Sequence, residues 1–363
     1  MRKLFINLTV CLVTIVLMLS AAEFALRLVY DHELSGSWRV FDDRGLRLNK
    51  SAGTFPHHRV GYSTTYSFRY PHLRSGNATD GAHRILVLGE SFTFGWLLDW
   101  HDTYVGQLED RIQAEFGPSV FEIANAAVGG WGVDSYLAYL EGYGEEVDPD
   151  IVLVFLNTDD IERATKYGLY EMKDGRLVAS EVPVSFPRRL VKALPAYNYL
   201  LSRSYLVDAV RTAYVNLRYG EADGQLFWGP GMENGEAMVS TPQDLEAVRL
   251  GRVIFEKIIE WCAERDATLL VLTTAWHNPP YRGKNANELF MADASKFFAA
   301  RQVKYFDGSD QLIERKLDLN TPIYIANDGH PNEEGARLIA EINWPFLKAK
   351  LTEFCKLKTC AQD

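Results

Sequence analysis

Two short segments, far apart in the chain, carry side chains that together could cleave an ester. Ser91 follows the apolar run Ile85–Leu88 and Gly89, and such a run is typical of a strand buried on both faces of a parallel sheet. The glycine permits a tight turn, so we expect Ser91 at the carboxyl edge of this strand, where open α/β sheets bind their substrates. His330, with Asp328 two residues before it, lies in a polar loop ahead of a helical pattern.

A serine hydroxyl becomes a nucleophile when a base accepts its proton, and a carboxylate normally orients that base. We therefore predict that Ser91 is the nucleophile, that His330 is the base and that Asp328 orients the imidazole. Taken alone, Asp-Gly-His is as compatible with a structural turn and helix cap as with a catalytic pair. The hypothesis requires both segments to meet at one edge of the sheet.

Acyl transfer also needs hydrogen-bond donors for the oxyanion that develops on the carbonyl. The backbone N–H of Ser91, at a predicted helix start, is one candidate. Gly130 lies in the turn after the next strand and lets the backbone approach a substrate closely, although a plain turn is the commoner role of such a glycine. A third donor is expected in the segment 157–160, at the end of the third strand.

The elements that position these residues alternate between strand and helix, which predicts an α/β fold with a mainly parallel sheet and right-handed crossovers. One helix begins with Thr241 as N-cap, Pro242 at the first position and Asp244 at the capping-box position. The expected strands are 84–88, 120–123, 151–156, 268–273 and 303–306, and the main expected helices are 104–116, 241–265, 286–300 and 332–353.

The first 29 residues predict a membrane anchor. Arg2 and Lys3 precede an uncharged, largely apolar run from Leu4 to Ala22. About 20 apolar residues span a bilayer, and the leading positive charges favour a cytoplasmic N-terminus, with the rest of the chain outside. Ser20-Ala21-Ala22 also resembles a signal-peptidase site, so secretion after cleavage is the alternative. We prefer the uncleaved anchor because the helical pattern continues through residue 29.

The remaining segments complete the domain prediction. We expect a juxtamembrane segment of short strands and loops at 30–82, a catalytic domain at 83–353 with an insertion at 162–240, and a tail at 354–363. The insertion is equally compatible with ordinary packing and with a wall or lid over the substrate. Cys355 and Cys360 are close enough for a small disulfide loop, and Cys262 is expected as a buried thiol.

Four blocks, in order along the chain, resemble the SGNH (GDSL-type) hydrolase family. They are residues 89–93, 125–132, 157–160 and 328–330, and the N-terminal anchor is similar to that of membrane-tethered bacterial members. The resemblance implies a flavodoxin-like, three-layer α/β/α sandwich preceded by one transmembrane helix, and ester or acyl-group chemistry without a cofactor.

The chain departs from the family pattern in three places. Glu90 replaces the usual aspartate. In the family pattern, the residue at this position supports the turn. The Asp-x-His spacing is similar to that of alginate-type polysaccharide O-acetyltransferases. The family's oxyanion asparagine falls on Asp159, and an ionised carboxylate only accepts hydrogen bonds. We therefore prefer Asn157 as the donor and keep Asp159, which would have to be protonated, as the alternative.

These observations predict a serine ester hydrolase that acts on an O-acyl, and specifically an acetyl, ester, with a cell-envelope glycan as the expected carrier. The alternatives are an O-acetyltransferase that modifies an exported polysaccharide, and a catalytically silent envelope-binding protein. The net charge of −10 disfavours a nucleic-acid partner, and no spacing of cysteine or histidine suggests a metal site. The expected location is the inner membrane, single-pass, with the catalytic domain in the periplasm.

Overall fold

The computed structural model describes residues 2–29, 38–59, 62–74, 81–157, 159–180, 203–210, 241–274, 285–317, 322–326 and 328–358, together with residues 34, 79, 199, 200, 213 and 360. Most of the predicted insertion at 162–240 lies outside these residues.

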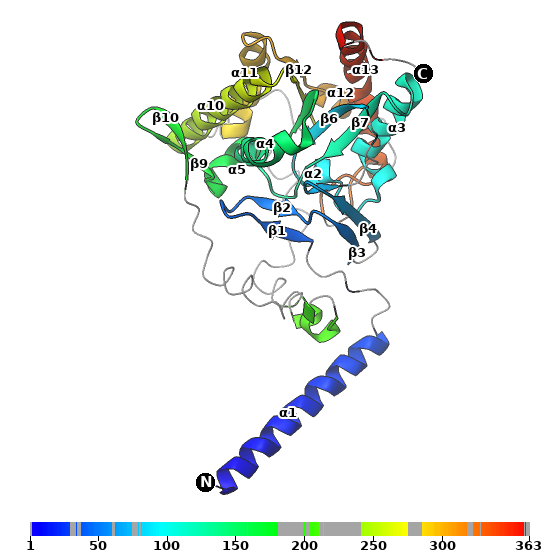
Figure 1. Cartoon of the computed structure of the whole chain (residues 1–363), viewed down its shortest axis with the longest axis vertical. Helices are drawn as coiled ribbons and strands as arrows, with labels where there is room; N and C mark the ends of the chain where they lie inside the picture. Colours follow the sequence, from blue (N-terminus) through cyan, green and yellow to red (C-terminus); the bar gives the residue numbers. More distant parts are fainter. Residues whose placement is uncertain are drawn as a thin grey trace.

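Within the described residues, a central sheet of eight strands forms the body of the protein (Figure 1). Neighbouring strands run parallel in the order β12 (Lys304–Phe306), β11 (Thr268–Thr273), β8 (Ile151–Leu156), β6 (His83–Leu88) and β7 (Phe121–Asn125). Every residue of β8 is buried, as expected for an apolar strand covered on both faces.

Helices cover both faces of this sheet. Leu86 and Leu88 of β6 belong to an apolar cluster with α4 (Val133–Val147), α5 (Asp160–Tyr167), α10 (Pro242–Glu264) and α11 (Ala286–Ala299). Ile85 and Val87 belong to a second cluster with α3 (Tyr104–Phe116), α12 (Ser309–Leu317) and α13 (Glu333–Lys358). Because successive side chains of a strand point to opposite faces, these two clusters place one helical layer on each side and confirm the predicted α/β fold.

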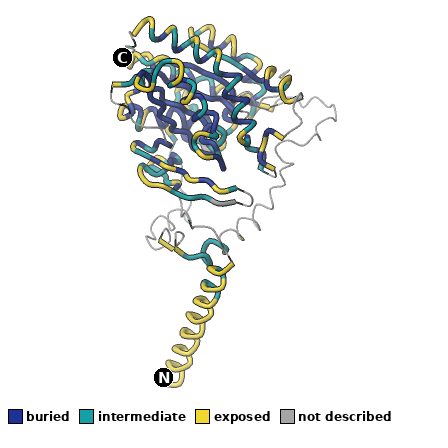
Figure 2. The backbone as a smooth tube through the Cα atoms, turned by 90° about the vertical axis from the view of Figure 1, so that its right-hand side faces the viewer, coloured by how far each residue is buried: buried dark blue, intermediate teal, exposed yellow. Residues whose placement is uncertain are grey.

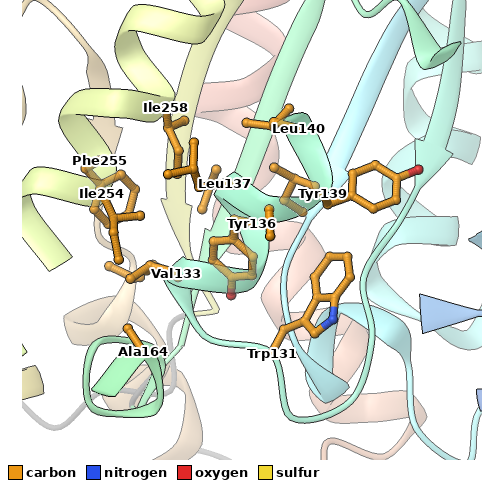
Figure 3. Packing of buried hydrophobic residues seen from close by; sticks show 14 of the residues in the cluster. Trp131, Val133, Tyr136, Leu137, Tyr139, Leu140, Ala164, Ile254, Phe255 and Ile258 are labelled. Atoms are coloured by element: carbon orange, nitrogen blue, oxygen red, sulfur yellow. The ribbon is translucent and has the colours of Figure 1, made fainter. Parts of the chain in front are cut away.

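The packing on the first face is shown in Figure 3. Leu137 of α4 lies toward Ile258 of α10. The Thr241 and Asp244 side chains form the predicted capping box at the start of α10, with Pro242 at its first position.

Parallel register brings the carboxyl ends of three strands together. Val87 of β6 pairs with Asn125 of β7, and Leu88 pairs with Val154 of β8. The chain segments that follow these strands therefore meet at one edge, and they carry Ser91, Gly130 and Asn157.

The segment 30–82 contains short strands, as expected, and three of them belong to the central sheet. Its strands β3 (Gly53–Arg59), β4 (Tyr62–Arg69) and β5 (Leu73–Arg74) extend the central sheet in antiparallel pairing beyond β7. Alternate residues of β4 are buried, which is the pattern of a strand with one covered face. The strands β1 (Arg39–Phe41) and β2 (Arg47–Asn49) form a separate antiparallel pair.

Several shorter elements complete the fold. The helix α2 (Ser91–Phe94) and the 3-10 helix η1 (Trp100–Asp102) follow β6, and the hairpin β9 (Tyr170–Lys173) and β10 (Arg176–Ala179) follows α5. The helix α13 continues to Lys358, so much of the predicted tail is helical. Cys355 and Cys360 form a disulfide, and Cys262 is a buried free thiol.

The N-terminal helix α1 (Arg2–Val29) extends away from this body (Figure 1), and Figure 2 shows it exposed along most of its length. The most apolar stretch of 18 residues in this helix has a mean hydropathy of 2.4. The helix is long and apolar enough to span a membrane, a property that signal sequences share.

Candidate active site

The turn after β6 holds Ser91 at the first position of α2. An ideal Cβ added to Gly89 would lie 2.0 Å from Thr93 Oγ1, a separation that no side chain tolerates, so glycine is required there. Asn125 at the end of β7 donates from Nδ2 to the carbonyl of Thr93, 2.9 Å away. The tight packing of this turn fixes the hydroxyl of Ser91 at the edge of the sheet.

The structure brings the three predicted catalytic side chains together. His330 Nε2 lies 2.7 Å from Ser91 Oγ, although 239 positions separate them in the chain. The other ring nitrogen, Nδ1, is hydrogen-bonded to Asp328 Oδ1. The Asp328 side chain is only 6% exposed and that of His330 is 22% exposed. This is the geometry of a nucleophile, a base and an orienting carboxylate.

A tight loop holds Asp328 and His330 on the same side of the chain. Gly329 between them has a φ of +82°, the left-handed conformation that favours glycine. The N–H of Ile325 donates to the carbonyl of His330 at 2.7 Å, and the N–H of Asp328 donates to the carbonyl of Ile325 at 3.2 Å. These bonds close the loop just before α13. The closed loop lets the side chains of Asp328 and His330 meet although the two residues are only two positions apart.

Trp96 is a contact of the site that the sequence did not reveal. Its indole Nε1 donates to Asp328 Oδ2 at 3.3 Å, so both carboxylate oxygens of Asp328 are engaged. The rings of Trp96 and Phe92 lie 6.1 Å and 5.2 Å from the ring of His330. Phe92 and Trp96 thus help to set the orientation of the imidazole.

Glu90 also contacts the reacting groups, which extends the turn-supporting role that the resemblance implied for it. It is fully buried. Its Oε2 accepts from the N–H and the hydroxyl of Ser91, and its Oε1 accepts from the N–H of Phe92 and from Asn157 Nδ2, each at 2.7 Å. Glutamate is one methylene longer than the family's usual aspartate, which gives this carboxylate the reach for these contacts.

One arginine balances the negative charge behind the site. Arg163 lies 3.3 Å from Glu90, 2.7 Å from Asp159 and 3.8 Å from Asp160. Burial raises the pKa of Glu90, but Arg163, His330 and the accepted hydrogen bonds together bring that pKa below its ordinary value. Burial raises the pKa of Asp159 to about 6, against the opposing effect of Arg163, and the pKa of Asp160 lies well above its ordinary value because of burial and the nearby Glu90.

The predicted oxyanion donors have the following places in the structure. Gly130 lies in the turn after β7 with a φ of +86°. The amide of Asn157 is fixed at both ends, because Nδ2 donates to Glu90 and Oδ1 accepts from Thr274 at 2.9 Å. Asp159 faces Arg163. The N–H of Ser91, expected to point toward the substrate, instead donates to Glu90, because the longer side chain folds back over the helix start.

The strands of segment 30–82 support the glycine turn. Arg47 donates from Nη1 to the carbonyl of Gly129 at 2.8 Å, and the carbonyl of Arg47 accepts from Trp131 Nε1 at 2.6 Å. Asn49 donates to the carbonyl of Ala127 at 3.1 Å. Trp131 is buried and belongs to the apolar core.

The sequence model of the GDSL-like Lipase/Acylhydrolase family matches residues 87–338. The chain belongs to this family. The match begins within β6 and ends within α13, and it includes the serine, glycine, asparagine and histidine segments described above. A search of curated proteins finds no match.

Solved structures similar to this chain include the following three. TesA is 16% identical over 74% of this chain and 99% of its own, with a TM-score of 0.42. The psychrotrophic esterase EstA from Pseudoalteromonas sp. is 14% identical over 74% and 99%, with a TM-score of 0.40. A catalytic mutant of Axe2, an acetylxylan esterase from Geobacillus stearothermophilus, is 11% identical over 75% and 94%, with a TM-score of 0.41.

Proposed function

We propose that the protein is a serine ester hydrolase that removes O-acyl groups, with acetyl as the acyl group and a cell-envelope glycan as its carrier. The observation that carries this proposal is the chain of contacts from Ser91 Oγ to His330 Nε2 and from His330 Nδ1 to Asp328. Membership of the acylhydrolase family supports the reaction class, and the acetylxylan esterase fold neighbour agrees with an acetyl ester.

In the proposed reaction, Ser91 Oγ attacks the ester carbonyl while His330 Nε2 accepts the hydroxyl proton. The bond to the alcohol then breaks, and His330 returns the proton to the leaving oxygen. Water repeats these steps on the acyl-serine and regenerates the enzyme. Asp328 holds the imidazole with Nδ1 protonated, so that Nε2 is free to act as the base.

The hydroxyl of Ser91 has two acceptors in the structure, Glu90 Oε2 and His330 Nε2, and only one proton to donate. Attack requires that proton on the side of His330. For the oxyanion, we propose two donors, the N–H of Gly130 and the second amide hydrogen of Asn157. The amide of Asn157 lies beside the start of α2, because its Nδ2 and the N–H of Phe92 both donate to Glu90 Oε1.

The experiment is hydrolysis of p-nitrophenyl acetate by the full chain in detergent, with longer acyl esters alongside. We expect Ser91→Ala to lose turnover, and Ser63→Ala, which changes an exposed serine of β4, to keep it. Equal turnover by Ser91→Ala would refute the proposal. Mass analysis of the products with and without an added polysaccharide separates hydrolysis from acetyl transfer.

We also propose that α1 remains attached as a single-pass anchor with the catalytic domain in the periplasm. The residues just after the small-residue motif Ser20-Ala21-Ala22 contact the rest of the chain. Glu23 accepts hydrogen bonds from Ser204 Oγ at 2.8 Å and from the N–H of Leu206 at 2.9 Å, and Arg27 donates to the carbonyl of Arg203 at 2.6 Å. Retention of the protein in carbonate-washed membranes would support the anchor, and release of a mature chain that lacks its first residues would contradict it.

A further inference from the structure

One part of the insertion is bound to the end of the N-terminal helix. The Glu23 carboxylate accepts from the N–H groups of Tyr205 and Leu206 at 3.2 Å and 2.9 Å. Arg27, one turn farther along α1, donates to the carbonyl of Arg203 at 2.6 Å, and its Cζ lies 5.4 Å from the ring centroid of Tyr205. Figure 1 shows this short green helix beside the end of α1. These contacts fix its height along α1.

The sequence of α1 relates that height to a bilayer. The uncharged run from Leu4 to Ala22 is about 28 Å long at 1.5 Å per residue, and the hydrocarbon core of a bilayer is about 30 Å thick. In a bilayer-spanning α1, Glu23 lies at the end of the core and Arg27 about 6 Å beyond it. The polar headgroup region is about 5–7 Å deep on each side. The part of the insertion that these two residues hold therefore lies at the level of the headgroups.

The side chains of this part suit that level. We call residues 199, 200 and 203–210 the docked segment. Tyr199, Leu200 and Val210 are 60%, 43% and 61% exposed, and the exposed Arg203 has its Cζ 5.1 Å from the ring centroid of Tyr199. Tyrosine is enriched at membrane interfaces, and arginine there keeps its charge at the headgroups while its stem covers apolar surface. Exposed apolar residues are common on soluble surfaces, but these are held at the depth of a lipid interface.

We propose that the docked segment lies in the outer interface of the bilayer beside α1, with the side chains of Leu200 and Val210 in contact with lipid. Short helices in such an interface bury their apolar side chains at the boundary between headgroups and acyl chains. This inference rests on the anchor proposed above and assigns a membrane-contact surface to part of the insertion. Two attachments restrict the orientation of the body relative to the membrane more than the spanning helix does alone.

The test measures the depth of spin labels on the full chain in nanodiscs of phosphatidylcholine and phosphatidylglycerol. Oxygen is enriched in hydrocarbon and a neutral nickel chelate in water, so the ratio of their relaxation effects reports depth. The labels are placed at Leu200→Cys and Val210→Cys in a Cys11→Ser background, with the buried Cys262 left in place. The matched control, Ala299→Cys, changes an exposed residue at the end of α11. A label on the native Cys11, which is exposed on α1, marks the membrane core.

We expect the oxygen-to-nickel ratio at Leu200 and Val210 to be severalfold higher than at Ala299 and lower than at Cys11. A ratio at either site equal to that at Ala299, with a high ratio at Cys11, would overturn the inference and leave the anchor proposal intact. A low ratio at Cys11 would overturn the anchor proposal itself. Low accessibility of either site to both reagents would show burial against protein, such as a second copy of the chain, and would also overturn the inference.

If the labelled variants misfold, the unsubstituted chain decides the matter. A lipid with a diazirine near its glycerol backbone is activated by light in the same nanodiscs, and the modified peptides are mapped. We expect adducts in α1 and in residues 203–210, and none at the end of α11. Adducts in α1 without any in residues 203–210 would overturn the inference.

Discussion

Replacement of Asn157 by alanine tests the proposed oxyanion donor. The amide of Asn157 is buried and held between Glu90 and Thr274, so its second N–H has a fixed direction. Loss of one oxyanion donor costs about 10²–10³ in kcat. We expect Asn157→Ala to lower kcat by that factor with little change in KM, because the donor acts on charge that develops only in the transition state.

Asp159 is the competing donor, and its pKa makes the two hypotheses distinguishable. It could donate only when protonated, and its pKa is raised to about 6, mainly by burial. At pH 8 about one molecule in a hundred would then be protonated, and at pH 5 about nine in ten. If Asp159 were the donor, Asp159→Asn would exceed the wild type by about 100-fold at pH 8 and would match it at pH 5.

The assay is the kcat of p-nitrophenyl acetate hydrolysis from pH 5 to pH 8 for the wild type, Asn157→Ala and Asp159→Asn, with thermal unfolding as a check on the fold. Our account predicts a ratio of Asp159→Asn to wild type that stays within about tenfold and flat with pH. A ratio that climbs about tenfold per pH unit above pH 6, together with a small effect of Asn157→Ala, would refute the assignment.

Three further predictions follow from the site and its surroundings. Asp328→Asn should lower kcat by about 10³–10⁴ while the protein stays folded, because the imidazole loses its orienting carboxylate; a loss under tenfold in the ester assay would contradict its role. Arg163→Met should lower the free energy of unfolding, measured in urea, by about 3–5 kcal/mol, because the buried Glu90 would lose its cation; an unchanged midpoint would contradict this. Asp134 has its pKa raised from 3.8 to about 7 by burial, so its ionisation opposes folding. The free energy of unfolding should therefore fall between pH 4 and pH 8 by up to about 4 kcal/mol from this residue, and Asp134→Asn should flatten that decline; an equal slope in the variant would contradict the assignment.

The parallel core was predictable because its signals are local. The uninterrupted apolar run of β8, Ile151–Leu156, has the bounds expected from the sequence, and the capping box at Thr241 marks the start of α10. Ser91 was predictable at the edge of the sheet because parallel strands bring their carboxyl ends together. Its pairing with His330 was predicted from the residue types, because His330 lies in a loop before α13 and not at a strand end. The spacing of Asp328 and His330 has its reason in the left-handed Gly329.

The parts that escaped prediction depend on contacts between distant residues. The strand β5 has only two residues and β3 lies at the edge of the sheet, and only the pairing of β3, β4 and β5 shows that they extend it. The bond from Trp96 to Asp328 spans 232 positions and leaves no periodic pattern. The reach of Glu90 to Ser91 follows from one additional methylene and from the neutralising Arg163, and neither effect is visible in a motif.

The identity of the nucleophile is the claim on which the rest of the account depends. The direct measurement is the mass of the full chain after reaction with a fluorophosphonate probe, followed by mapping of the modified peptide. Our account predicts one adduct on Ser91, no adduct in Ser91→Ala and a greatly slowed reaction in His330→Ala. An adduct on another residue, or equal labelling in all three proteins, would contradict it.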